Sequence, residues 1–167
     1  MSFGHTLFTI GGLIILSTFI LSLNNSIVQN VTTMTQSSVL MEAIALGEKY
    51  IEEAETCRFD EDPSATIPSS FVSSYNLGPD GSESYPNFDD VDDFDGYTLR
   101  DTQSASVPFN ISIDVAYVTL AHPDTPTSSR TYYKRMTVSV SSAALSSLPA
   151  NTLKLKRLFA YHYFYTE

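Results

Sequence analysis

Charged side chains are absent from the first 41 residues of this 167-residue chain. No Asp, Glu, Lys or Arg precedes Glu42, and the first cation is Lys49. Charged residues are almost never buried in an apolar environment, whereas an uncharged segment can lie in an apolar environment. The distribution therefore indicates two environments, one dry and one aqueous.

Basic residues are also scarce. Nine Lys and Arg stand against nineteen Asp and Glu, which gives a formal net charge of −10. Nucleic acids and anionic lipid headgroups both require a clustered basic surface. The composition excludes both partners, so any membrane contact must be hydrophobic.

Cysteine occurs once, at Cys57, which excludes an intrachain disulfide. We interpret Cys57 as a half-buried small apolar residue at a helix end. A thiol that pairs between chains or binds a metal is the alternative.

Signatures of catalysis are missing as well. The chain has no Gly-x-Ser-x-Gly elbow and no Gly-rich phosphate loop. Its three histidines, His5, His122 and His162, lie far apart without metal-ligand spacing. We predict that the protein is not an enzyme and that it has no cofactor, metal site or small-molecule substrate.

The uncharged segment contains an apolar run over residues 3–23. A helix of that length spans roughly 30 Å, the thickness of a bilayer's hydrocarbon core. A cleaved secretory signal would begin with basic residues and end with a small-residue cleavage site, and residues 1–25 offer neither. We therefore predict membrane insertion, while the lack of Lys or Arg on the N-terminal side leaves the orientation open.

The helical pattern continues beyond the apolar run. Residues 26–56 contain no Pro, and one apolar stripe recurs at three- and four-residue steps: Leu40, Ala43 or Ile44, Gly47, Tyr50 or Ile51, and Ala54. From this stripe we choose Leu40, Ile44, Gly47, Ile51 and Ala54 as the residues that pack on a sheet. Residues 24–33 are the weakest part of the helix, where it could unwind locally, and Pro63 closes any continuation.

The remainder predicts a β-rich head. Residues 57–108 read as an irregular acidic connection with one short strand near 70–76, and three strand candidates follow at 109–120, 131–141 and 152–165. The expected fold is α+β: a long N-terminal helix whose apolar half protrudes and whose amphipathic half packs on an antiparallel sheet of three to four strands. The predicted divisions are 1–25, 26–56, 57–108 and 109–167.

Acidic residues gather in the irregular connection. Residues 80–101 hold eight Asp and Glu against Arg100 alone. Closely spaced carboxylates on a loop can bind Ca²⁺, but an EF-hand loop fails here because Val91 and Thr102 occupy ligand positions. A solvated loop built from Asx turns is the alternative.

Charge is also divided along the head. Sixteen of the nineteen acids lie in 42–101, whereas six cations lie in 130–157: Arg130, Lys134, Arg135, Lys154, Lys156 and Arg157. Such patches can pair between subunits and set their register. They can equally meet within one head, and the sequence does not separate the two arrangements.

The order of apolar helix, amphipathic extension, irregular loop and antiparallel sheet resembles type IV pilins and the pseudopilins of type II secretion. Residues 4–9, Gly-His-Thr-Leu-Phe-Thr, are similar to a degenerate prepilin processing motif, which places a cleavage site between Gly4 and His5. Residues 45–54 with 58–61, and the aspartate-rich 89–97, resemble minor pilins of the mannose-sensitive haemagglutinin type.

The chain departs from that family at one position. The family carries a glutamate at the fifth mature residue, where it is thought to neutralise a neighbour's N-terminal amine. Cleavage after Gly4 would put Thr9 at that position, with no carboxylate near it, and residues 1–4 lack the usual basic leader.

The resemblance implies a structural subunit of a type IV pilus-like filament, held in the bacterial inner membrane before assembly and found afterwards in a periplasmic or extracellular filament. Its partners would be copies of itself or other pilin-like subunits. The expected filament-core residues are Leu7, Phe8, Ile10, Gly11, Gly12, Leu13, Ile14, Leu16, Phe19, Ile20 and Leu23. A minor pseudopilin of a secretion machine, and a single-pass membrane-anchored binding protein that does not polymerise, are the alternatives.

Overall fold

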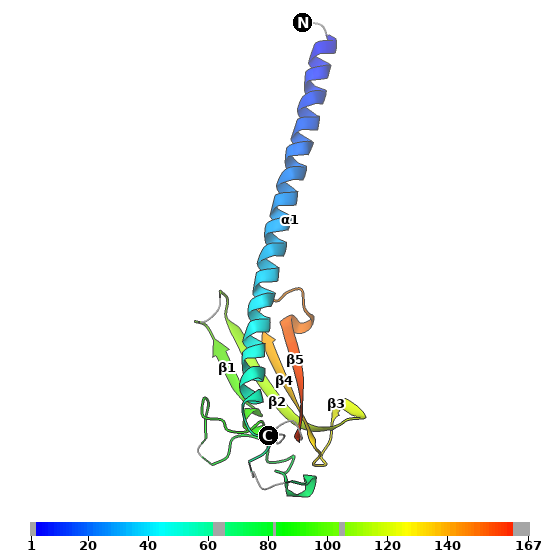
Figure 1. The fold of residues 1–167 in the computed structure, drawn as a ribbon. Helices are drawn as coiled ribbons and strands as arrows, with labels where there is room; N and C mark the ends of the chain where they lie inside the picture. The colour runs from blue at the N-terminus through cyan, green and yellow to red at the C-terminus, as the bar shows by residue number, and fades with distance from the viewer. Residues whose placement is uncertain (1–2, 62–65, 82, 104–105, 162–167) are drawn as a thin grey trace. The chain divides into compact units, whose positions relative to one another are not determined.

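A computed structural model describes residues 3–61, 66–81, 83–103 and 106–161 of the chain (Figure 1). The chain divides into two units, Met1–Ser38 and Val39–Glu167. The division falls inside the helix, thirteen residues after the boundary that the sequence predicts at residue 25. Each unit is described by itself below.

Helix α1 covers Phe3–Glu55. No Pro occurs before residue 63, so nothing in this range removes a backbone hydrogen bond. The stretch at residues 24–33, the weakest part of the pattern, does not unwind, and the helix is continuous there. The hydroxyls of Thr32, Thr33 and Thr35 donate to carbonyls four residues earlier, which satisfies these polar groups within the helix.

Helix α1 ends before Cys57. The amides of Thr56 and Cys57 donate to the carbonyls of Glu53 and Ala54, three residues back, which tightens the last turn. Pro63, expected to close the helix, lies outside the described residues.

Within the described part of the head, five strands form the sheet, and these strands all pair antiparallel. They are β1 (Thr98–Asp101), β2 (Phe109–Thr119), β3 (His122–Pro126), β4 (Tyr133–Ser141) and β5 (Thr152–Ala160). Their order is β1-β2-β4-β5, and β3 pairs with the end of β2. The α+β class with an antiparallel sheet under the helix is confirmed, and β1 and β3 are additions to the three predicted strands.

Alternation along the strands decides which face is buried. Ile111, Ile113, Val115 and Tyr117 of β2 are buried while the side chains between them are exposed or half-buried, as their spacing predicts. Met136, Val138 and Val140 of β4 lie opposite this row and are also buried. One face of the sheet is therefore apolar and needs a cover.

The C-terminal part of α1 supplies that cover, with Val39, Ala43, Gly47, Tyr50, Ile51 and Ala54 buried. A Cβ on Gly47 would lie 2.6 Å from Leu155 Cδ1 of β5, so the absence of a side chain is what allows this close approach. Leu40 packs at the edge of the core, half-buried. The choice of Ile44 is wrong: it is 38% exposed, and Ala43 takes the inward position.

Residues 57–108 contribute more than a connection. The expected strand near residues 70–76 is wrong, because a 3₁₀ turn at Pro68–Ser70 is followed by irregular chain. This region nevertheless places Phe59, Phe71, Val91 and Phe94 in the core. Phe59 and Phe71 pack with their ring centroids 5.4 Å apart, and Phe88 and Phe94 with theirs 5.0 Å apart.

Candidate functional site: an apolar helix segment and a buried charge cluster

The described part of the N-terminal unit is an uncharged helix whose surface is largely apolar over residues 3–23 and mostly polar over residues 24–38. Its described residues are all exposed except Gly11, which is half-buried, and residues as large as Phe3 and Phe8 are more than 80% exposed. Helix α1 contains an 18-residue window with a mean hydropathy of 2.1, none of it buried. Within the described residues, α1 is the one helix long and apolar enough to cross a membrane, so it can serve as an anchor.

The threonine hydroxyls of this segment are satisfied within the helix. The hydroxyls of Thr6, Thr9 and Thr18 donate to carbonyls three or four residues earlier, at 2.8–3.1 Å. Lipid offers no hydrogen-bond partners, so a hydroxyl that bonds to its own helix enters hydrocarbon at low cost. The threonines are therefore compatible with a dry surrounding.

Every predicted filament-core residue lies on this segment, and all except Gly11 are exposed. Gly11 and Gly12 line a shallow, open hollow on the helix surface together with Gly4, Leu7, Phe8 and Ile15. A Cβ on Gly12 would meet nothing within 4 Å. Small residues on a helix surface allow another helix to approach closely.

The predicted processing residues lie in the first turn of the same helix. Gly4 and His5 are both exposed, and the carbonyl of His5 accepts a hydrogen bond from Thr9. The surroundings of both residues are open.

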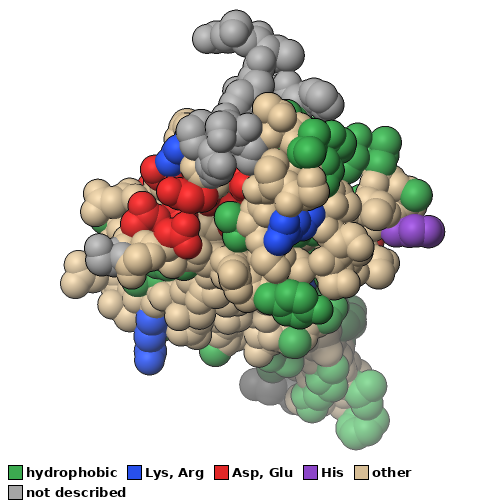
Figure 2. All heavy atoms as spheres, turned by 90° about the horizontal axis from the view of Figure 1, so that it is seen from below, with side chains coloured by type: hydrophobic (Ala, Val, Ile, Leu, Met, Phe, Trp, Pro, Cys, Tyr) green, Lys and Arg blue, Asp and Glu red, His purple; other side chains and the backbone are tan. Residues whose placement is uncertain are grey.

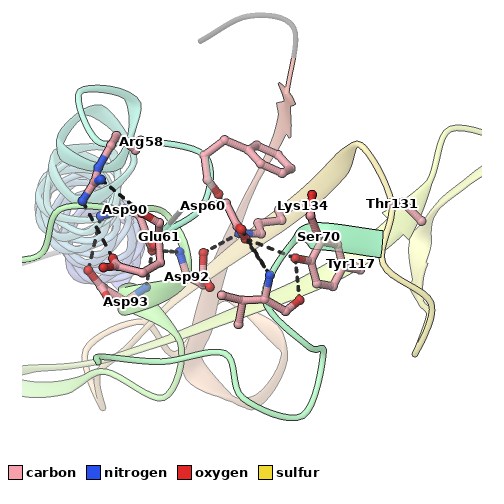
Figure 3. Close-up of polar contacts among 12 residues, drawn as sticks. Arg58, Asp60, Glu61, Ser70, Asp90, Asp92, Asp93, Tyr117, Thr131 and Lys134 are labelled. Carbon is pink, nitrogen blue, oxygen red and sulfur yellow. Dashed lines mark hydrogen bonds and ion pairs between the residues drawn. The ribbon is translucent and has the colours of Figure 1, made fainter. Parts of the chain in front are cut away.

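The head contains a buried charge cluster that the sequence does not predict (Figure 3). Lys134 of β4 is fully buried, and its Nζ donates to the carbonyl of Phe59 at 2.6 Å and to Asp60 Oδ1 at 2.9 Å. It also forms an ion pair with Asp92 Oδ1. Three acceptors match the three protons of an ammonium.

The backbone around residue 90 explains why carboxylates gather beside Lys134. Arg58 pairs with Asp90 in a parallel β-bridge, which holds the chain after α1 against the aspartate-rich turn. Asp90 Oδ1 accepts from the amides of Asp92 and Asp93, and Asp93 Oδ2 accepts from the amides of Asp89 and Asp90. These are the Asx-type bonds expected of an aspartate-rich loop.

Burial shifts the acid–base properties of this cluster. Burial is the largest cause that raises the pKa of Asp90 to about 9, and the neighbouring charge of Asp92 is the next. Burial also raises the pKa of Asp92, against the opposing attraction of Lys134. Asp90 is therefore a neutral acid near pH 7 and donates its proton to the Asp92 carboxylate.

Further carboxylates lie on the surface next to the cluster, and Figure 2 shows acidic side chains gathered on one face of the head. Oxygens of Glu61, Asp89 and Asp90 lie within 4.8 Å of one another, as do those of Glu83, Asp89 and Asp93. Hard divalent cations take such oxygen ligands. Arg58 pairs with Asp89, so part of this charge is already balanced.

The division of charge along the chain is partly resolved inside the head. Lys134 pairs with Asp60 and Asp92, and Arg157 pairs with Glu55. Lys156 pairs with Asp124 at the surface. These three cations thus have partners within the chain.

The lone thiol and the histidines lie apart from these features. Cys57 is half-buried directly after α1, with Sγ 3.4 Å from the carbonyl of Glu53, and burial raises its pKa. This position agrees with a packing residue. His5 and His122 are on different units and His162 lies outside the described residues.

Comparison of the chain with protein-family models, with curated proteins and with solved structures finds no match.

Proposed function

We propose that this protein is a structural subunit of a type IV pilus-like filament, stored in a membrane through the N-terminal part of α1 and assembled by packing that helix against other copies. The supporting observation is the surface of residues 3–23, which is largely apolar, uncharged and exposed. Exposed apolar surface of this extent marks a membrane or protein interaction site.

Hydrophobic energetics favour burial strongly. Each large side chain removed from water contributes about 1.5–3 kcal/mol. Burying a handful of them therefore keeps the segment out of water, in a membrane or against other helices, whereas helix association among lipid tails depends on close packing. Residues 3–38 carry many more: Phe3, Leu7, Phe8, Ile10, Leu13, Ile14, Ile15, Leu16, Phe19, Ile20, Leu21, Leu23, Ile27, Val28, Val31 and Met34.

The hollow at Gly11 and Gly12 favours assembly over a solitary anchor. A helix that only contacts lipid needs no small-residue face, whereas close helix–helix packing does. Residues such as Leu7 and Phe8 beside the hollow are the knobs that a neighbouring copy would accept in its own hollow.

Electron microscopy of the chain expressed in cells with a pilus assembly machinery tests the proposal. Gly12→Leu fills the hollow and should abolish filaments while membrane insertion persists; Ile14→Leu, which conserves volume, should leave filaments intact. Filaments that form equally with Gly12→Leu would contradict packing through the hollow. A wild-type chain that inserts but stays monomeric would favour a membrane-anchored binding protein.

A further inference from the structure

The buried contact between Lys134 and Asp60 brings together an amine and a carboxyl group, the two groups that condense to an amide. Both side chains are at most 1% exposed, and Nζ lies 2.9 Å from Asp60 Oδ1. The rings of Phe59 and Tyr117 lie over the amine, with centroids 4.6 and 5.4 Å from Nζ. The Lys134 amine and the Asp60 carboxyl group are thus held in contact, away from solvent and beside two aromatic rings.

A third group in contact with the amine can move the protons that a condensation requires. The Asp92 carboxylate touches Nζ and is itself nearly fully buried. On the other side of Asp60, the amide of Val72 donates to both carboxylate oxygens, at 3.2 and 3.1 Å. That donor stabilises negative charge which develops on an oxygen during attack at the carboxyl carbon.

We propose that Lys134 and Asp60 form an intramolecular isopeptide bond, with Asp92 as the proton-transferring group. Asp92 accepts one proton from the Lys134 ammonium, and the neutral Nζ attacks Cγ of Asp60 to form the Nζ–Cγ bond. A second proton then leaves Nζ as one Cγ–O bond breaks. Both protons depart with that oxygen as one water molecule, so no oxidant, reductant or further reactant is needed.

The surroundings suit the product as well as the reactants. The new amide N–H can donate to Asp92, and the amide oxygen retains the Val72 N–H. Condensation also removes one positive and one negative charge from a low-dielectric position where ions are poorly stabilised. Burial raises the pKa of Asp92, which makes its carboxylate a better proton acceptor than an ordinary aspartate.

The bond would join two distant parts of the head. Asp60 follows α1 and Lys134 lies in β4, 74 residues further along the chain. A covalent link there would hold the segment after the helix on a central strand of the sheet, even when the loops between them open.

Mass spectrometry of the purified full-length chain under denaturing conditions tests the proposal. We expect a mass one water below that of the uncondensed chain, and a branched peptide joining Asp60 to Lys134 after proteolysis. The reference is Lys134→Arg: the mass difference between it and the wild type should exceed the substitution difference by one water. A wild-type chain with the mass of the uncondensed sequence would overturn the proposal and show that Lys134 and Asp60 form only a buried ion pair.

Two comparisons assign the roles. Asp92→Asn keeps both reactants but removes the proton acceptor, so we expect the full mass; a branched peptide at wild-type yield would refute the role of Asp92. Lys156 and Asp124 form a Lys–Asp contact of 2.6 Å at the exposed surface and should stay unlinked. A branch at Asp92 instead of Asp60 would overturn the assignment of the acceptor.

Chemical labelling gives an independent readout. In denaturant, an amine-acylating reagent should modify Lys49, Lys154 and Lys156 but not Lys134. Labelling of Lys134 to the same extent as the other lysines would contradict the bond.

Discussion

The close approach of α1 to the sheet at Gly47 supports a quantitative prediction. A Cβ at this position would lie 2.6 Å from Leu155 Cδ1, whereas carbon atoms in good contact are about 3.5–4.0 Å apart. Gly47→Ala therefore overpacks the interface, at a cost of about 1–3 kcal/mol. Against this, alanine stabilises a helix interior by about 1 kcal/mol relative to glycine.

The two effects separate in a double-mutant cycle. We expect Gly47→Ala alone to lower the free energy of unfolding by about 0–2 kcal/mol, because overpacking exceeds the helix gain. In a Leu155→Ala background the obstructing side chain is gone, so the same change should raise it by about 1 kcal/mol. The predicted coupling between the two positions is thus about 1–3 kcal/mol.

Urea unfolding of the full chain in mild detergent measures this coupling. The chain has ten Tyr and no Trp, so tyrosine fluorescence and near-ultraviolet circular dichroism are suitable signals. Leu158→Ala is the matched control, because Leu158 is on the same strand but 39% exposed. An effect of Gly47→Ala that is the same in all three backgrounds would refute the close packing of α1 on β5.

Three further predictions concern the head. Lys134→Met leaves buried carboxylates without their cation, so it should lower the free energy of unfolding of the head by about 3–5 kcal/mol, measured in urea. A much smaller decrease would contradict a fully desolvated cluster. Because the pKa of Asp90 is raised to about 9 in the folded state, its contribution to stability is full below about pH 4 and is lost as the pH rises toward 9. Asp90→Asn mimics the protonated acid and should flatten this part of the profile, and an unchanged slope between pH 5 and 9 would contradict the shift. Phe94→Ala should cost about 3–5 kcal/mol because its ring is fully buried, whereas Tyr75→Ala, at an 85% exposed position, should change stability little.

The elements with strong periodicity are those that sequence reasoning locates. Helix α1 follows from the absence of Pro and the stripe ending at Ala54, and β2 follows from the alternation of Ile111, Ile113, Val115 and Tyr117. Strand β3 is not predicted from the sequence, because His122–Pro126 is exposed at every position although its backbone pairs with β2. Burial periodicity cannot reveal a strand that buries nothing.

The error at Ile44 has a different origin. Ala43 and Ile44 both satisfy a helical stripe, and hydrophobicity favours the larger residue. The distance between helix and sheet is short at Gly47, and Ala43, about one turn earlier, lies inward while Ile44 is 38% exposed. That distance depends on the tertiary structure and has no local signal.

The buried charge cluster had one signal in the sequence. Lys134 has the same parity in its strand as Met136, Val138 and Val140, which places its side chain on the inward face. A lysine on a buried face requires partners. Asp60 and Asp92, which are 74 and 42 residues away, could not be identified without the fold.

Sedimentation of the full-length chain with and without detergent tests the central claim most directly. The account predicts that the chain is extracted from membranes only by detergent and, once detergent is removed, sediments as filaments or large assemblies through its apolar helix surface. A full-length chain that sediments as a monomer in detergent-free buffer would contradict the account.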